Sequence, residues 1–277
     1  MNPIRSILSS LILCFSLSAV AQSPQLVKLW ETDSTFKVPE SVFYSEEGNI
    51  LYVSNIDGKP DEKDLKGSIS KLSLDGKKVT HYWAVNLSAP KGLGLYKNQL
   101  FVADLDEVVA IDIKSGKVSQ RIPVEGAIFL NDLAIDQKGT IYVSDSRTGK
   151  IHRIQDGKVD TFLEGQINVN GLLVEGDHLL FVVKGALWKS DQSKVLIKVA
   201  SGMDESTDGI VRLVNNNLVV SCWNGIIYSV KADGTTKELV DTRAQKSNTA
   251  DIGYNPAQNI VYVPTFFKNK VVAYQVK

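Results

Sequence analysis

Apolar and polar residues alternate in short runs along most of the chain, and each run ends at a turn rich in Gly, Asn or Asp. An example is LNDLAIDQKGTIYVSD, which begins at Leu130 and places two alternating segments on either side of a Lys-Gly turn. A period of two residues is typical of β-strands with one buried face, and no segment has a helical period of useful length. The pattern therefore predicts an all-β protein built from hairpins.

The same unit of two strands and a turn occurs six times, and in most copies a third and a fourth strand follow. The copies are spaced at intervals of roughly 40 residues. One longer interval, between the first and second copies, contains an insertion at residues 55–67 (NIDGKPDEKDLKG). The six units begin at Pro39, Pro90, Leu130, Val169, Thr207 and Thr249.

Four short strands repeated with this period are the signature of a β-propeller blade, whereas a sandwich of unrelated hairpins would not give six equivalent strand starts. The last copy ends after its third strand, VVAYQVK, while QLVKLWETD near the N-terminus has the pattern of a fourth strand. Pairing the two would close the ring and remove an open sheet edge. We therefore expect residues 22–277 to form a single six-bladed β-propeller with four-stranded blades, closed by its N-terminal strand.

The first 21 residues have the pattern of a signal peptide. Arg5 supplies the positively charged start, residues 7–20 form a short apolar core, and residues 19–21 (Ala-Val-Ala) form a small-x-small cleavage site. The apolar run is shorter than the roughly 20 residues that a membrane-spanning helix needs. We expect the protein to be exported to a bacterial periplasm or the extracellular space, without a membrane span.

The composition is that of an ordinary soluble globular protein. The 31 basic and 31 acidic side chains balance, so no net field attracts nucleic acid or an anionic membrane. We find no basic stripe and no aromatic platform, and expect a small molecule rather than a nucleic acid as partner; protein partners stay open. Removal of a signal peptide would leave Cys222 as the only cysteine and would exclude an intramolecular disulfide.

The second residue of each unit should lie at one mouth of the central channel, because the innermost strand of every blade lines that channel. Strand starts favour β-branched and aromatic residues, yet this set contains two carboxylates and two amides. Oxygen ligands of this kind suit calcium, so the set predicts a divalent-metal site assembled from several blades. The six positions are occupied by Glu40, Lys91, Asn131, Asn170, Asp208 and Ala250.

Two alternatives stay open for these residues. Asn and Asp are frequent at turns because their side chains bond to nearby backbone, so any single position could serve local structure alone. Lys91 argues against a cation, since an ammonium group repels it. The Lys91 side chain could bend away along the channel, hold a substrate carboxylate, replace the metal, or form a salt bridge with Glu40 or Asp208.

Other motifs that carry chemistry are absent or isolated. There is no P-loop and no GxSxG nucleophile elbow, and the SxxK match at residues 68–71 has no partner motifs. His81, His152 and His178 fall on a fourth strand, a third strand and a turn far from the six positions, which disfavours zinc. The insertion at residues 55–67 should leave the first blade on the same side as the six positions, where it could act as a lid.

These motifs together resemble the senescence marker protein/gluconolactonase (regucalcin-like) family of six-bladed propellers, in an exported bacterial branch, and more distantly the paraoxonases. The resemblance covers essentially the whole chain after the signal peptide. It rests on PE at residue 39, LND at residue 130, VNG at residue 169 and TDG at residue 207. Members of the family bind a divalent metal, commonly calcium, through a Glu, two Asn and an Asp in these motifs, and several hydrolyse lactones.

Carried over by motif, the metal ligands are Glu40, Asn170 and Asp208. The resemblance implies that Asn131 is a further ligand or a substrate contact, and that Asp208 is the general base. We therefore predict metal-dependent hydrolysis of a lactone or related small ester, with the substrate bound by Lys91 and Asn131. The alternative is a propeller without enzymatic activity that binds a small ligand or a protein partner.

The resemblance also bears on the number of metal ions. Some relatives hold a second ion with acidic residues one position further along the strands. Here Asp132 is acidic but Ser41 is not, so we expect a single ion at the channel mouth.

Overall fold

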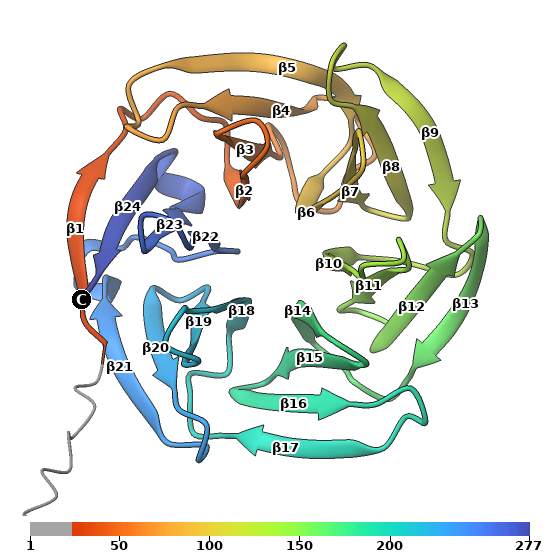
Figure 1. Cartoon of the computed structure of the whole chain (residues 1–277). Coiled ribbons are helices and arrows are strands. Elements are labelled where there is room, and N and C mark those ends of the chain that lie inside the picture. Colours follow the sequence, from red (N-terminus) through yellow and green to blue (C-terminus); the bar gives the residue numbers. More distant parts are fainter. Residues whose placement is uncertain (1–23) are drawn as a thin grey trace, which may run out of the picture.

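The computed structural model describes residues 24–277, and the predicted signal peptide at residues 1–21 lies outside the described residues. The described chain forms six four-stranded sheets arranged as a ring around a central channel (Figure 1). The prediction of a six-bladed β-propeller is confirmed. Helix within residues 24–277 is limited to two 3₁₀ turns, η1 (Arg243–Gln245) and η2 (Phe266–Lys268), and no helix there is long and apolar enough to cross a membrane.

In blades one to three, four consecutive strands run from the channel to the outer rim. Blade one consists of β2 (Pro39–Ser45), β3 (Ile50–Asn55), β4 (Gly67–Leu72) and β5 (Val79–Leu87). Blade two consists of β6 (Pro90–Tyr96), β7 (Gln99–Asp104), β8 (Glu107–Asp112) and β9 (Val118–Pro123). Blade three consists of β10 (Leu130–Ile135), β11 (Ile141–Asp145), β12 (Lys150–Gln155) and β13 (Lys158–Leu163).

Blades four and five follow the same order, and blade six joins the two ends of the chain. Blade four consists of β14 (Val169–Glu175), β15 (His178–Val183), β16 (Ala186–Ser190) and β17 (Leu196–Ala200). Blade five consists of β18 (Thr207–Arg212), β19 (Leu218–Cys222), β20 (Ile226–Val230) and β21 (Thr236–Asp241). Blade six consists of β22 (Gly253–Asn255), β23 (Ile260–Pro264), β24 (Val271–Val276) and β1 (Leu26–Glu31).

The N-terminal strand closes the ring, as the sequence predicts. Strand β1 pairs antiparallel with β24, with Leu26 opposite Val276 and Trp30 opposite Ala273. Figure 1 shows the red β1 lying beside the blue β24 at the outer rim. The edge of β24 is thereby covered by hydrogen bonds from the other end of the described chain.

The hydrophobic core lies between neighbouring blades. Leu180 and Val182 of β15, for example, pack in one cluster with Ile210 and Val220 of blade five. Each blade packs against both of its neighbours, and successive residues of one strand enter different clusters: Val220 lies in the cluster shared with blade four and Val219 in the cluster shared with blade six.

The inner strands of blades one to five are irregular at the polar position that the sequence singles out. In blade one the register with the second strand shifts between Pro39 and Val42, and the equivalent shift occurs in the next four blades. Residues inside such a bulge lose their ladder partners and the strand bends. The polar residue of each blade is therefore free to line the channel mouth instead of packing between sheets.

Buried serines satisfy the backbone at three of these bulges. Ser54, Ser144 and Ser221 occupy the same place in strands β3, β11 and β19 and are fully buried. Each hydroxyl oxygen accepts, at 2.9 Å, the backbone N–H of the residue that follows the polar position in its blade. The backbone N–H group next to each of these three polar residues is therefore hydrogen-bonded inside the protein.

Glycine after the polar position lets the inner strands approach closely. A Cβ atom on Gly171 would lie 2.0 Å from the backbone oxygen of Asp208, and one on Gly209 would lie 2.3 Å from Asp251 Oδ1. Neither position has room for a side chain. This explains the glycine in the VNG and TDG motifs as a packing requirement of the channel wall.

Candidate functional site

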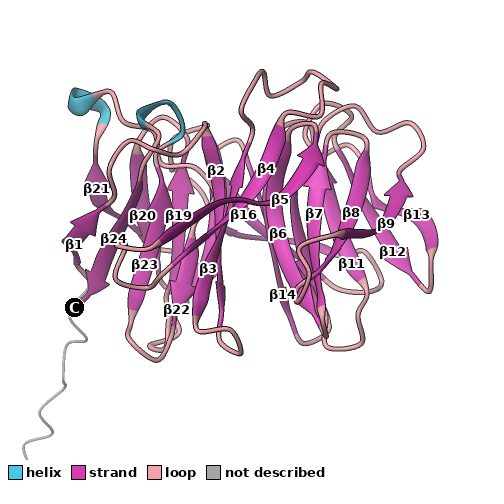
Figure 2. Cartoon of the chain, turned by 90° about the horizontal axis from the view of Figure 1, so that it is seen from above, coloured by secondary structure: helices cyan, strands magenta, loops and turns pink. Residues whose placement is uncertain are grey.

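Of the six second residues of the repeated units, the five polar ones line a pocket of about 470 Å³ at one mouth of the channel. Its lining includes Glu40, Lys91, Asn131, Asn170 and Asp208, as the sequence predicts. The sixth residue, the alanine of blade six, is buried in an apolar cluster beside the pocket. Both 3₁₀ turns lie on one face of the ring (Figure 2), and η2 contributes two residues to the pocket wall.

Two carboxylates form the acidic part of the pocket. Glu40 and Asp208 are 5% and 2% exposed. Burial raises the pKa of Glu40 well above its usual range, and the charges of Asp208 and Asp251 raise it further, while Lys91 opposes them. The pKa of Asp208 is also raised, first by burial and then by the acids around it. Two such groups favour a bound cation or a bound proton at this mouth.

One oxygen of Glu40 has no protein partner. Glu40 Oε2 is buried and accepts no hydrogen bond from residues 24–277. Buried polar atoms are nearly always hydrogen-bonded, so an unpartnered carboxylate oxygen in a pocket fits a site for a cation or a hydrogen-bond donor.

The two asparagines that line the pocket use their amide nitrogens within the protein. Asn170 Nδ2 donates to Asp208 Oδ1 at 3.1 Å, and Asn131 Nδ2 donates to Ser146 Oγ at 3.0 Å. The Ser146 hydroxyl in turn donates to the backbone oxygen of Val169 at 2.6 Å, which links blade three to blade four. In both amides the nitrogen is used by the protein, so the oxygen is left for a ligand.

Lys91 is buried in the pocket wall without an acidic partner. Its Nζ donates to the backbone oxygen of Ala89 at 3.0 Å and lies 4.3 Å from the centre of the Phe129 ring. None of the salt bridges among residues 24–277 includes Lys91. Burial lowers its pKa to about 8, against the charges of Glu40 and Asp104. The salt bridge with Glu40 or Asp208 that the sequence left open is not formed.

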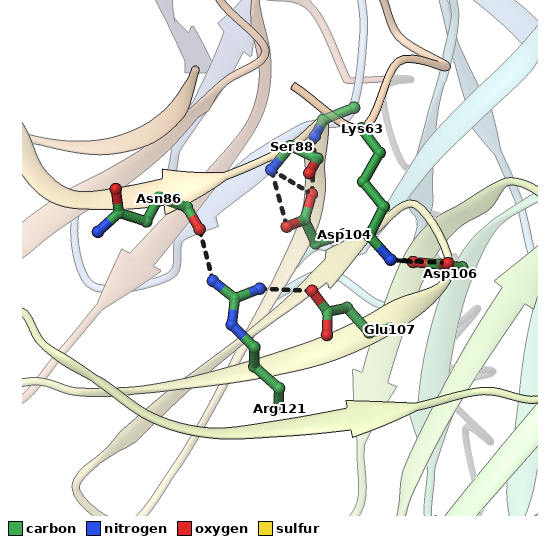
Figure 3. A network of polar contacts seen from close by, with 8 residues as sticks. Lys63, Asn86, Ser88, Asp104, Asp106, Glu107 and Arg121 are labelled. Atoms are coloured by element: carbon green, nitrogen blue, oxygen red, sulfur yellow. Dashed lines mark hydrogen bonds and ion pairs between the residues drawn. The ribbon is translucent and has the colours of Figure 1, made fainter. Parts of the chain in front are cut away.

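A polar network in blade two fixes the loop that leads to Lys91 (Figure 3). The carboxylate of Asp104, at the end of β7, accepts the N–H of Ser88 at 3.0 and 2.9 Å and that of Ala89 at 2.7 Å. Arg121 ties blade two to blade one just before this loop, by donating at 2.5 Å to a backbone oxygen near the end of β5. Because Ala89 is held, its carbonyl stays aimed at the lysine.

In blade three, Asp145 likewise holds the loop before the inner strand by accepting backbone N–H groups. It ends β11, and its two oxygens accept the N–H groups of Ile128 at 2.9 Å and Phe129 at 3.1 Å. The Phe129 ring that covers Lys91 is therefore fixed from its own blade. Neither Asp104 nor Asp145 was predicted from the sequence to have a role, although each ends the second strand of its unit and this repetition is a signal that could have found them.

Two further buried acids lie one residue beyond the polar positions. Asp132 and Asp251 line a second pocket, of about 530 Å³, whose other residues come from the inner strands and the turns that follow them. Asp251 Oδ2 accepts the hydroxyl of Ser41 at 2.5 Å. Asp132 accepts the N–H of Leu133 at 2.7 Å and that of Leu172 at 2.6 Å, and so joins β10 to β14. Both acids hold neighbouring inner strands together.

Asp251 was not predicted from the sequence. Only the second residue of each unit was considered, which in blade six is Ala250, and the acid beside it was passed over. The alignment of TAD with LND would have placed Asp251 opposite Asp132. Burial raises the pKa of Asp251 to about 6, and the pKa of Asp132 is raised well above its usual value for the same reason.

The insertion of blade one crosses toward two other blades. Asp61 pairs with Arg147 of blade three and Lys63 pairs with Asp106 of blade two, both at 2.8 Å. Ile56 and Pro60 of the same segment line the pocket. The segment therefore lies on the side of the polar positions, as predicted, and forms part of the pocket wall.

Three aromatic residues form another wall, which we call the aromatic lip: Trp223, Phe266 and Phe267. They belong to the loops between the second and third strands of blades five and six. Sequence reasoning missed them, since loops do not repeat from blade to blade and carry no periodic signal.

The carboxylate and amide oxygens of the pocket are of the chemical type that a hard divalent cation binds. Among residues 24–277 no three Asp, Glu, His or Cys side chains gather as a metal-binding group, so any cation here would depend on amide oxygens as well. Calcium accepts carboxylate and Asn side-chain oxygens together. The unpartnered Glu40 oxygen, and the two amides whose nitrogens are already hydrogen-bonded within the protein, agree with such a ligand.

Comparisons with known proteins support the fold. No family model matches the chain, and no match to it was found among curated protein sequences. Its structural neighbours include a gluconolactonase from Xanthomonas campestris, with a TM-score of 0.71 and 15% identity over 88% of this chain and 88% of that one. A luciferin-regenerating enzyme gives a TM-score of 0.66 and 15% identity, covering 92% of this chain and 95% of its own. A streptogramin B lyase gives a TM-score of 0.65 and 12% identity, covering 92% of this chain and 98% of its own.

These identities are low, so they establish the architecture rather than a shared reaction. The presence of gluconolactonase-like propellers among the neighbours is consistent with the family resemblance read from the four sequence motifs.

Proposed function

We propose that this protein is a metal-dependent hydrolase that opens a lactone or related small ester at the 470 Å³ pocket, with calcium as the first candidate metal. The observation that carries the proposal is the pair of buried carboxylates, Glu40 and Asp208, whose raised pKa values and unpartnered oxygen mark a site for a positive ligand. The gluconolactonase-like neighbours support an enzyme of lactonase-like kind.

The cation would be held by side-chain oxygens of Glu40, Asn131, Asn170 and Asp208. When bound, it would supply Lewis-acid polarisation of the scissile carbonyl group. The remaining work falls to the protein's own residues.

Asp208 takes the proton of the attacking water in this proposal. Its Oδ1 is held by the Asn170 amide at 3.1 Å, which leaves Oδ2 for the proton. Burial and neighbouring acids raise the pKa of Asp208, so its ionised form is a stronger base than an ordinary aspartate. The water oxygen bonds to the carbonyl carbon, the ring C–O bond breaks, and the proton passes to the departing alkoxide to give a hydroxy acid.

Lys91 and Asn131 position the substrate. The Lys91 ammonium group, held at the wall by Ala89, suits an anionic group of the substrate or the carboxylate of the product. Asn131 is fixed by its hydrogen bond to Ser146 and offers its oxygen to the same space. We further propose that the protein acts after export, on the pattern of residues 1–21.

The test is metal analysis of the purified protein combined with a panel of lactones and small esters. We expect a bound divalent metal, turnover of at least one lactone, loss of that turnover in EDTA and its return when metal is added back. Failure to turn over any lactone or ester at any metal concentration, with a small molecule still bound at the mouth, would favour the non-enzymatic alternative.

A further inference from the structure

The aromatic lip is a continuous apolar surface within the pocket. The ring of Trp223 lies edge-on to Phe266 and Phe267, with centroids 5.5 and 5.9 Å apart, and the two phenylalanines are 4.7 Å apart. All three line the pocket that also contains Glu40 and Asp208. A single exposed phenylalanine needs no explanation, but a cluster of three beside polar groups is typical of a ligand-binding wall.

The lip is held firmly from behind. Phe266 is only 6% exposed and packs in a cluster with Ile56, Ala250 and Val38. Its backbone has φ of +46°, a region that a bulky residue rarely occupies and that must be imposed by its surroundings. At the end of the same turn, Asn269 Oδ1 accepts the N–H of Val38 at 2.9 Å, which ties the turn to the start of blade one.

Phe267 projects from this anchored turn. It is 64% exposed, although its two aromatic neighbours are largely covered. An apolar ring presented to the pocket by a strained and well-packed turn would be stabilised by an apolar ligand lying against it.

The pocket has one polar wall and one aromatic wall. Lys91, Glu40, Asp208 and the two asparagines make up the polar part, while the lip offers ring faces and edges. A sugar lactone carries hydroxyl groups on most of its carbons, and each would need a hydrogen-bond partner when buried. The two phenylalanines of the lip provide no such partner, and Trp223 provides one donor, its indole N–H.

We propose that the aromatic lip is a specificity subsite for an apolar substituent of the substrate, either an alkyl chain or an aryl ring, attached to the lactone or ester whose carbonyl lies at the polar ring. The inference rests on the proposed hydrolase function. It narrows the expected substrates from lactones in general to lactones and esters that carry an apolar substituent. A volume of about 470 Å³ lies within the range of roughly 300–1,000 Å³ that ligand pockets occupy and exceeds the need of a bare ring.

The experiment compares kcat/KM for three six-membered lactones: δ-valerolactone, the same ring with a pentyl or phenyl substituent, and glucono-δ-lactone. We expect the substituted lactones to be preferred, by about fourfold for each methylene group that the lip covers. Phe267→Ala should raise KM for the substituted lactones roughly fivefold to tenfold and raise KM for δ-valerolactone much less.

Val214→Ala is the matched control, because Val214 is equally exposed, at 64%, but lines the other pocket. It should change none of these values. Turnover with no preference for a substituent, or a Phe267→Ala effect of equal size on all lactones, overturns the subsite and leaves the hydrolase proposal standing.

A binding measurement separates the two proposals if no lactone is hydrolysed. Calorimetric titration would use the non-hydrolysable six-membered lactam that carries the same pentyl or phenyl group. Binding that is weakened fivefold or more by Phe267→Ala, and not by Val214→Ala, supports the subsite although the hydrolase proposal has failed. No binding of the substituted lactam to the wild-type protein overturns the subsite.

Discussion

Ionisation of the buried Asp251 should lower the stability of the metal-free protein as the pH rises. Burial raises its pKa in the folded protein from 3.8 to about 6. Between these values the folded protein keeps a proton that the unfolded chain releases, so the free energy of unfolding falls with increasing pH through this window and stays lower above it. A shift of this size corresponds to about 3 kcal/mol, or roughly 6–12 °C in melting temperature for a chain of this length.

The assay compares wild type and Asp251→Asn by thermal unfolding in EDTA at pH 4 and pH 7. The asparagine keeps an oxygen that can accept the Ser41 hydroxyl but cannot ionise. We expect the melting temperature of the variant, relative to wild type, to rise by about 6–12 °C between pH 4 and pH 7. The exposed Asp177→Asn variant, in the turn between β14 and β15, is the control and should follow wild type. Parallel pH profiles for wild type and Asp251→Asn would refute the reasoning.

Two further predictions concern ring closure and metal binding. Deletion of residues 25–33 removes β1 and exposes the edge of β24, so the melting temperature should fall and the transition broaden; an unchanged cooperative melt would refute closure by this strand. Glu40→Gln should abolish the rise in melting temperature that calcium causes, because the charged ligand is lost, while Lys91→Ala should preserve or enlarge that rise by removing a repulsive charge. Equal calcium-induced shifts in wild type and Glu40→Gln would show that Glu40 is not a ligand.

The fold and the position of the polar residues were predictable because they repeat. Successive residues of a strand point to opposite faces of its sheet, and six blades that close a ring must each begin at the same place. Glu40, Lys91, Asn131, Asn170 and Asp208 therefore stand out as one set in the amino-acid sequence alone, and the pocket contains all five.

Part of what sequence reasoning missed lies outside that repeat. Phe267 and Trp223 are on loops whose lengths and residues differ from blade to blade, so no period points to them. Asp251 was hidden because the equivalent polar position of blade six is an alanine. The direction of the Lys91 side chain, toward Ala89 and Phe129 rather than toward an acid, depends on the loop that Asp104 holds in place.

The central claim is that Asp208 acts as the base of a metal-dependent hydrolysis, and Asp208→Asn tests it most directly. The substitution keeps the shape and one oxygen donor but removes the proton acceptor and a negative charge. Asn170→Ala is the control, since an amide can contribute to metal binding and to the hydrogen bond with Asp208 but cannot act as a base.

The measurement is turnover of the preferred lactone by wild type, Asp208→Asn and Asn170→Ala over a titration of calcium. We expect Asp208→Asn to lose activity by about 10²–10⁴-fold at every calcium concentration, while Asn170→Ala is impaired at low calcium and largely recovers at high calcium. Full recovery of Asp208→Asn at saturating calcium would refute the assignment of Asp208 as the base and leave it a metal ligand alone.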